Sequence, residues 1–243
     1  MLDHHLFQSR LIKNSITSRR SQYQVLIGLS IAVIGLTAFA FFLNNRCFSL
    51  YFGTINPLIA ITLIVLLAAL SLSVLVSRGW FSICKETNHK GLWFSAVVAV
   101  PFALVVVLID LKAPLAKDIN VQFPESLLFY PAIGYVAEII FHVLPLTALL
   151  IFLTSLPIKI TVNQVLWPCV VIASLLEPVY QARSLAGYPL WIAIYVVFHV
   201  FLFNLVQLYI FERYDFVSMY CCRLTYYALW HVIWGSIRLR LLF

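Results

Sequence analysis

The chain has 243 residues, of which 63% are hydrophobic and only 10% are charged, and its formal net charge is +7. Soluble domains carry about 25% charged residues, so this composition excludes an ordinary soluble domain and indicates an integral membrane protein. The basic residues lie at the ends of apolar segments and form no basic surface alternating with stacking aromatic residues, which excludes nucleic acid as an expected partner. The expected surroundings are a lipid bilayer.

Apolar segments follow one another along almost the whole chain. A transmembrane helix needs about 20 predominantly apolar residues, and seven segments approach that length, at about 25–43, 57–76, 92–111, 127–154, 165–181, 189–211 and 216–235. We therefore predict an all-α fold, a polytopic bundle of about seven membrane helices. Residues 25–243 are expected to form one transmembrane domain, preceded by a basic cytoplasmic tail at 1–24.

The first apolar segment also has the pattern of a signal peptide, because Ala38-Phe39-Ala40 matches a small-x-small cleavage site. We interpret it as a membrane span, since the basic region ahead of it is long and residues 41–43 continue the apolar run.

Basic residues in alternate loops predict the orientation in the membrane. Cytoplasmic loops carry an excess of Lys and Arg, and the side that holds the N-terminus has the larger number. We therefore expect a cytoplasmic N-terminus in the cell membrane. The residues on the N-terminal side are Arg10, Lys13, Arg19, Arg20, Arg78, Lys85, Lys90, Lys159 and Arg213, and those on the other side are Arg46, Lys112, Lys117, Arg183, Arg238 and Arg240.

Polar side chains are concentrated in the second half of the chain, inside the predicted spans. A charged group near the centre of a bilayer costs about 2.5 to 3.5 kcal/mol, so each one needs a partner or a cavity. Residues four positions apart share one helix face, which pairs Glu138 with His142 and aligns Arg223, Tyr227 and His231. The other members of the set are Glu177, His199, Asn204 and Gln207.

Two prolines lie beside these polar residues. Pro178 directly follows Glu177 and leaves the carbonyl of Ser174 without its usual amide partner, and Pro145 does the same for Phe141. Irregular backbone at membrane depth is tolerated where it is buried in protein or lines a wet cavity. The sequence therefore predicts a hydrated cavity near these residues.

Two carboxylates and two imidazoles are the groups that hydrolysis needs. A glutamate in a confined site can take a proton from water, and a histidine can hold that water or donate to the leaving group. We therefore predict Glu138, His142, Glu177 and His231 as catalytic residues around one water. The predicted supporting residues are Arg223, Tyr227, His199 and Asn204.

The same four catalytic candidates allow other interpretations. They could ligate one divalent metal, or relay protons in a transporter. In a structural interpretation, either glutamate pairs with Arg223 as a buried ion pair, and the histidines hydrogen-bond between helices.

The order of these residues resembles the CPBP (Abi) family of intramembrane proteases, which includes the eukaryotic CAAX prenyl endopeptidases. The family pattern is E-E-x-x-x-R on one helix, F-x-x-x-H on a later one and H-x-x-x-N on a last one. The stretch AEIIFH at 137–142 resembles the first motif, SLLE at 174–177 stands in the place of the second, and YIFER at 209–213 with ALWH at 228–231 resembles the closing region. The likeness covers residues 90–243.

Several motif positions differ from the family pattern. Ala137 stands where the family has its first glutamate, which is thought to activate water, while His142 replaces the arginine and Glu177 the second-motif histidine. The third motif, H-x-x-x-N, can be aligned in two ways. In the first, His231 matches the histidine and Gly235 stands at the asparagine; in the second, Tyr227 stands at the histidine and His231 at the asparagine. An exchange of the glutamate and histidine positions between helices would preserve catalysis, with Glu138 or Glu177 as the base.

The resemblance implies a membrane-embedded protease that hydrolyses a peptide bond near the membrane surface, with a peptide or membrane protein as substrate. One alternative is a non-catalytic CPBP-like membrane protein with a structural or partner-binding role. A small-solute or proton-coupled carrier ranks third, because the chain has no evident inverted repeat.

Overall fold

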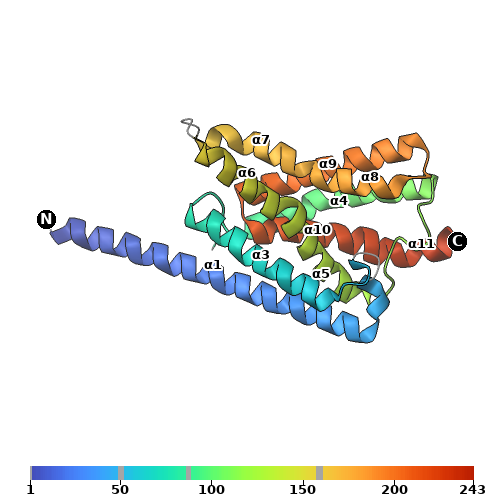
Figure 1. Cartoon of the computed structure of the whole chain (residues 1–243), viewed down its shortest axis with the longest axis horizontal. Helices are drawn as coiled ribbons and strands as arrows, with labels where there is room; N and C mark the ends of the chain where they lie inside the picture. The colour runs from blue at the N-terminus through green and yellow to red at the C-terminus, as the bar shows by residue number, and fades with distance from the viewer. Residues whose placement is uncertain (1, 49–51, 86–88, 157–160) are drawn as a thin grey trace.

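The computed structural model describes residues 2–48, 52–85, 89–156 and 161–243, apart from the side chains of residues 2–18, 45 and 46. Figure 1 shows a bundle of helices, and the described residues contain no strand. The long helices in the first half are α1 (Leu2–Leu43), α3 (Pro57–Ser77), α4 (His89–Lys112) and α5 (Ser126–Ala137), with the short turn η1 (Asn45–Phe48) after α1. The second half contains α6 (Leu144–Ser155), α7 (Val162–Ser174), α8 (Leu176–Ala182), η3 (Arg183–Leu185), α9 (Leu190–Arg213), α10 (Phe216–Tyr227) and α11 (Gly235–Leu241).

The predicted helical bundle is confirmed. Six helical stretches are long and apolar enough to cross a membrane, as an integral membrane protein requires, and they correspond to the first six predicted segments. The seventh predicted segment is also helical, from α10 to α11, but it carries several polar residues and is not among those six. The six stretches are Arg19–Leu43, Pro57–Ser77, His89–Lys112, Ser126–Ser155, Val162–Leu185 and Leu190–Arg213.

The basic N-terminal segment continues into the first span as part of one helix, α1. Figure 1 shows that the N-terminal part of α1 extends beyond the rest of the bundle. The cytoplasmic position of this segment remains a prediction. Lys159, one of the basic residues on which the predicted orientation depends, lies outside the described residues.

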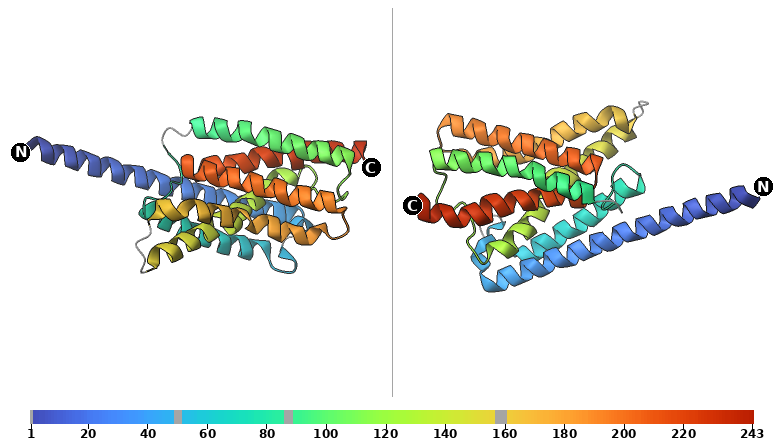
Figure 2. Two further views of the ribbon diagram at one scale, coloured as in Figure 1. Left: turned by 90° about the horizontal axis from the view of Figure 1, so that it is seen from above. Right: turned by 180° about the vertical axis from the view of Figure 1, so that it is seen from behind.

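Helix α10 lies against helices from several parts of the chain. It packs against α4, α5 and α9, and the two views of Figure 2 show it among the other helices, with α1 on the side away from α4. A side chain that points inward from α10 can therefore reach residues on more than one neighbouring helix.

The start of α10 is fixed by a buried carboxylate. One oxygen of Asp215 accepts from the amide of Ser218 at 2.8 Å, which caps the helix, and the other accepts from the amide of Lys85 at 2.9 Å. The amides of Phe216 and Val217 also donate to the carbonyls of Ser82 and Ile83. These bonds set the position from which α10 enters the bundle.

We expect the substitution Asp215→Ala to lower the free energy of unfolding by about 1 to 3 kcal/mol, because it removes a helix cap and leaves a buried amide unpaired. Thermal unfolding in detergent, followed by circular dichroism, measures the change. Asp118→Ala is the matched control, since Asp118 is exposed and should shift stability by less than about 0.5 kcal/mol. Equal stability of the two variants would contradict this role for Asp215.

Two π-helical turns interrupt the helices that carry the candidate residues. The turn η2 (Glu138–Val143) ends just before Pro145, and η4 (Ala228–Trp234) contains His231. Single π-helical turns inside α-helices occur often at functional sites. The irregularity near Pro145 agrees with the prediction, whereas η4 contains no proline and was not predicted.

The other predicted irregularity lies ahead of Pro178. Helix α7 ends at Ser174 and α8 begins at Leu176. The side-chain amide of Asn204 on α9 donates to the carbonyl of Ser174 at 3.3 Å. This carbonyl is the one that Pro178 leaves without an amide partner, so a neighbouring helix supplies the missing donor.

Candidate functional site

Arg223 on α10 connects the two predicted glutamates. Its Nε donates to Oε1 of Glu138 at 2.6 Å, and its Nη2 and Nη1 donate to the two carboxylate oxygens of Glu177 at 2.9 and 3.1 Å. All three side chains are buried. The arrangement is the buried ion pair of the structural interpretation, extended to both glutamates.

The remaining oxygens of this cluster also have donors. Gln207 accepts from Nη2 of Arg223 at 3.0 Å and donates to Oε1 of Glu138. Nδ1 of His142 lies 2.6 Å from Oε2 of Glu138, and an ionised carboxylate can only accept, so this nitrogen is the donor. Every oxygen of Glu138 is therefore occupied by a protein donor. We call Glu138, His142, Glu177, Gln207 and Arg223 the arginine cluster.

A cavity of about 960 Å³ lies beside the arginine cluster. Glu177 and Arg223 line it, together with Tyr227, His231 and His199, whereas Glu138 and His142 are not among the lining residues. Aromatic and aliphatic side chains form most of the remaining wall. A volume of this size accommodates a drug-sized or lipid-like ligand.

His231 is held in one orientation on the cavity wall. Its Nδ1 lies 2.6 Å from Oδ1 of Asn120. Its ring stacks on Tyr130, with 4.5 Å between centroids and 17° between the planes, and meets the edge of Tyr227 at 4.9 Å. Because the asparagine oxygen accepts, Nδ1 carries the hydrogen, and Nε2 has the free lone pair of a base.

Asn120 is a site residue that the sequence analysis missed. It lies in the polar stretch between α4 and α5, for which nothing in the sequence indicated contact with α10 or α11. The one related feature of the sequence is that Gly235 continues the four-residue series of Arg223, Tyr227 and His231 without a side chain. In the structure, an added Cβ at Gly235 would lie only 3.0 Å from Nδ2 of Asn120. The absent side chain at Gly235 leaves the space that Asn120 occupies next to His231.

The four predicted catalytic residues divide between two sets of hydrogen-bond partners. Arg223 joins Glu138, His142 and Glu177 in one network, but His231 has its own partners and shares only the cavity with Glu177. The physical reason is that two carboxylates attract the same guanidinium, which occupies the space between them. That all four residues form one catalytic site therefore stays a prediction.

The supporting residues divide in the same way. Tyr227 accepts from Nη1 of Arg223 at 3.2 Å and lines the cavity. His199 also lines the cavity and contacts the hydroxyls of Tyr195 and Tyr226 at 3.3 and 3.4 Å. Asn204 instead bonds to the backbone of α7. Arg223, predicted as a supporting residue, is the centre of the network.

A divalent metal was one alternative for the four candidate residues. In the part of the chain that the structure describes, no group of three or more His, Cys, Asp or Glu side chains is placed to hold a metal ion. Between Glu138 and Glu177, the positive charge is supplied by Arg223.

Comparisons with protein-family models, curated proteins and solved structures found no match to this chain. The likeness to the CPBP family therefore depends on the motif residues alone. Because a fold does not determine an activity, the function has to be inferred from the side chains that face the cavity.

Proposed function

We propose that the chain is a membrane-embedded hydrolase of the CPBP type that cleaves a peptide bond in its cavity, near the membrane surface. The observation that carries this proposal is the 2.6 Å contact between Nδ1 of His231 and Asn120 on the cavity wall. A base oriented by a second group is the recurring arrangement in hydrolytic sites.

In the proposed reaction, Nε2 of His231 takes a proton from a water molecule as the water attacks the scissile carbonyl. The hydroxyl of Tyr227 accepts from Arg223, which leaves its own proton free to stabilise the oxyanion. The histidine then returns its proton to the leaving amine. Glu177 holds Arg223 in place.

This assignment changes the roles expected from the sequence. His231 becomes the base in place of a glutamate, because both oxygens of Glu177 accept from Arg223. Glu138 and His142 act as positioning residues behind Arg223. They hold the guanidinium from the side away from the cavity.

Two positions support the resemblance to the CPBP family, although each differs from the family's motif. Ala137, at the position of the family's first glutamate, lines the cavity. An asparagine lies beside His231 as the third motif requires, but it comes from position 120 in place of Gly235. The register in which His231 is the motif histidine is therefore favoured.

We place the protein in the cell membrane with a cytoplasmic N-terminus, as the basic residues indicate. The loop after α4 and the residues after α8 lie at the end of the bundle opposite the start of α1 (Figure 1). The cavity residues in these loops would then lie on the non-cytoplasmic side.

A non-catalytic binding protein is the second candidate. It is favoured by the donors that occupy both oxygens of Glu177 and both oxygens of Glu138, which leave no free carboxylate to activate water. In this alternative, the arginine cluster stabilises the bundle, and the cavity binds an apolar partner without cleaving it.

The two candidates differ in what the variant His231→Gln does to peptide cleavage. Purified protein in lipid vesicles is mixed with fluorescence-quenched peptides of apolar sequence, with and without a lipid group. We expect His231→Gln to lower the cleavage rate by about 100- to 10,000-fold, the usual contribution of a general base. Tyr227→Phe should lower the rate less, because Arg223 remains.

His199→Gln is the matched control, since His199 lines the same cavity without a role in the proposed step. Wild-type rates in His231→Gln would contradict the hydrolase. The absence of any cleavage by the wild-type chain would favour the binding protein.

A further inference from the structure

A single cation without an ion-pair partner lines the cavity, among the residues that the structure describes. It is Arg183, which follows α8, has an exposed side chain, and forms no salt bridge in the described part of the chain. The other cavity arginine, Arg223, is already neutralised by Glu138 and Glu177. The charge that Arg183 brings to the cavity is therefore available to a ligand.

The cavity has an exposed end and a buried end. Ala116, Ile119, Arg183 and Ser184 line it and are exposed. At the other end, Phe203 and Arg223 are 3% and 2% exposed. A ligand therefore enters past Arg183 and ends near the arginine cluster.

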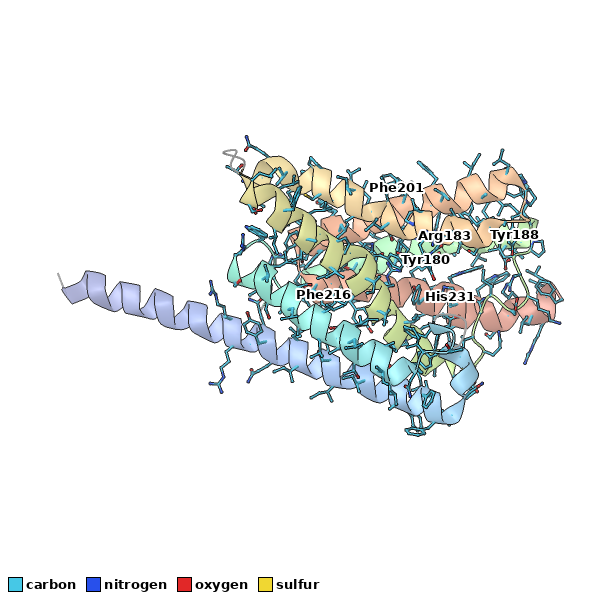
Figure 3. The ribbon with its side chains drawn as sticks, viewed as in Figure 1. Tyr180, Arg183, Tyr188, Phe201, Phe216 and His231 are labelled. Carbon is cyan, nitrogen blue, oxygen red and sulfur yellow. The ribbon has the colours of Figure 1, made fainter. Side chains whose placement is uncertain are left out.

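Figure 3 shows where the residues of the exposed end lie. Tyr180, Arg183, Tyr188 and His231 are found in the same half of the bundle, toward the end that holds the C-terminus. The hydroxyl of Tyr188 accepts from the amide of Ala116 at 2.8 Å, which ties the loop after α4 to the loop after η3. The two loops together form the rim of the cavity.

The wall between the two ends is mainly apolar, although Tyr195 and His199 on α9 also line it. Val196, Val200 and Phe203 follow one face of α9, and Ile133 and Val136 line the cavity from α5. Residues four positions apart on α9 lie above one another, so this wall runs along the helix axis. A wall of this kind suits an extended apolar chain that lies along α9.

Basic side chains outnumber acidic ones around the rim, where Lys112, Lys117 and Arg183 are accompanied by Asp118 and Glu125. Lys112 and Lys117 lie at the same end, where their ammonium groups stand over the rings of Trp191 and Phe243. The carboxylate of Asp110 does not reduce this charge, because Arg238 pairs with it. A positive rim around an apolar interior attracts anions that carry an apolar tail.

We propose that the cavity binds an amphiphile with one apolar chain and a terminal carboxylate or phosphate, which pairs with Arg183 at the rim. The apolar chain lies along the α9 wall, and in a substrate the peptide bond next to the anionic end lies within reach of His231. The inference deepens the proposed function by naming the chemical class of its substrate, and it can be tested by binding alone.

The test measures binding to the full-length protein in detergent micelles by tryptophan fluorescence. The probes are oleate and lysophosphatidylglycerol, which are anionic, with oleyl alcohol and lysophosphatidylcholine as neutral or zwitterionic counterparts. We expect both anionic probes to bind at least tenfold more tightly than their counterparts. Arg183→Gln should weaken anionic binding about tenfold and change the binding of oleyl alcohol less than twofold.

The matched control is Lys112→Gln, which removes a positive charge from the same end without touching the cavity lining. It should change affinity less than threefold. A second variant, Val196→Trp, fills the apolar wall and should weaken all four probes. Whether the natural ligand carries a carboxylate or a phosphate is decided by whether oleate or lysophosphatidylglycerol binds more tightly.

Equal affinity for charged and neutral probes, or an unchanged affinity in Arg183→Gln, would overturn the proposal. This outcome is distinguishable from failure of the hydrolase, because Arg183→Gln is judged by the affinity for the anionic probes, whereas His231→Gln is judged by the rate of peptide cleavage. Binding without cleavage would overturn only the hydrolase.

Discussion

Replacement of Arg223 by methionine is expected to lower the free energy of unfolding by about 3 to 5 kcal/mol. The substitution leaves two buried carboxylates without their shared cation, and an unpaired buried charge is one of the most destabilising changes a protein can suffer. Arg223 forms hydrogen bonds with Glu138, Glu177, Gln207 and Tyr227. The first three of these residues lie on other segments, η2, α8 and α9, so the substitution also removes bonds between helices. Thermal unfolding in detergent measures it.

A combined variant separates the charge effect from the loss of packing. Arg223→Met together with Glu138→Gln and Glu177→Gln removes all three charges, and replacing a complete buried ion group by neutral residues is often close to neutral for stability. We expect the triple variant to recover most of the stability that the single variant loses. A single variant that costs less than about 1 kcal/mol would contradict the role given to Arg223.

Asp110→Ala should have the second largest effect, again about 3 to 5 kcal/mol. Asp110 and Arg238 are both fully buried, and the carboxylate accepts from Nε and Nη2 of Arg238 at 2.7 and 2.8 Å. Trp234 and the amide of Leu115 supply two further donors. Removal of Asp110 leaves the guanidinium buried without its anion.

The same pair positions the loop that carries Asn120. Arg238 donates to the carbonyls of Leu115 and Ala116, so it holds the start of that loop against α11. Asp110→Ala should therefore lower cleavage as well as stability. The matched control is Asp110→Ala combined with Arg238→Met, which removes both charges and should recover stability without recovering full cleavage. Recovery of both would show that the pair has no positioning role.

The sequence was sufficient to predict the helical bundle and the side-chain contacts within a single helix. Runs of about 20 apolar residues predict the spans directly. The four-residue spacing correctly placed Glu138 beside His142, which lie 2.6 Å apart. The same spacing predicted the stripe of Arg223 and Tyr227, whose side chains form a hydrogen bond.

Contacts between distant segments could not be predicted in this way. Asn120 and His231 are separated by 111 positions, and Asp110 and Arg238 by 128. Periodicity gives the face of a helix but not the neighbour of that face. Asp110 lies near the end of its apolar segment, where a charge is expected at a membrane boundary, so nothing marked it as the partner of a buried arginine.

The choice between a shared water and a shared arginine also required the structure. The sequence placed two glutamates on separate helices near one arginine, and both arrangements satisfy that pattern. The distances favour the arginine, because one guanidinium reaches both carboxylates at 2.6 to 3.1 Å. In the proposed hydrolase we therefore assign the base to His231, which has its own orienting partner in Asn120.

The proposed hydrolase requires a water-accessible cavity that opens beside Ala137 and His231. Ala137 lines this cavity, whereas Ile139, two positions later, is fully buried and does not. The direct measurement is the rate at which a membrane-impermeant thiol reagent labels single cysteines introduced at Ala137, His231 and Ile139, in a chain whose five native cysteines are replaced by alanine. We predict that Ala137→Cys and His231→Cys are labelled and that Ile139→Cys is not. Protection of all three positions, or equal labelling of Ala137→Cys and Ile139→Cys, would contradict the cavity and with it the proposed hydrolase.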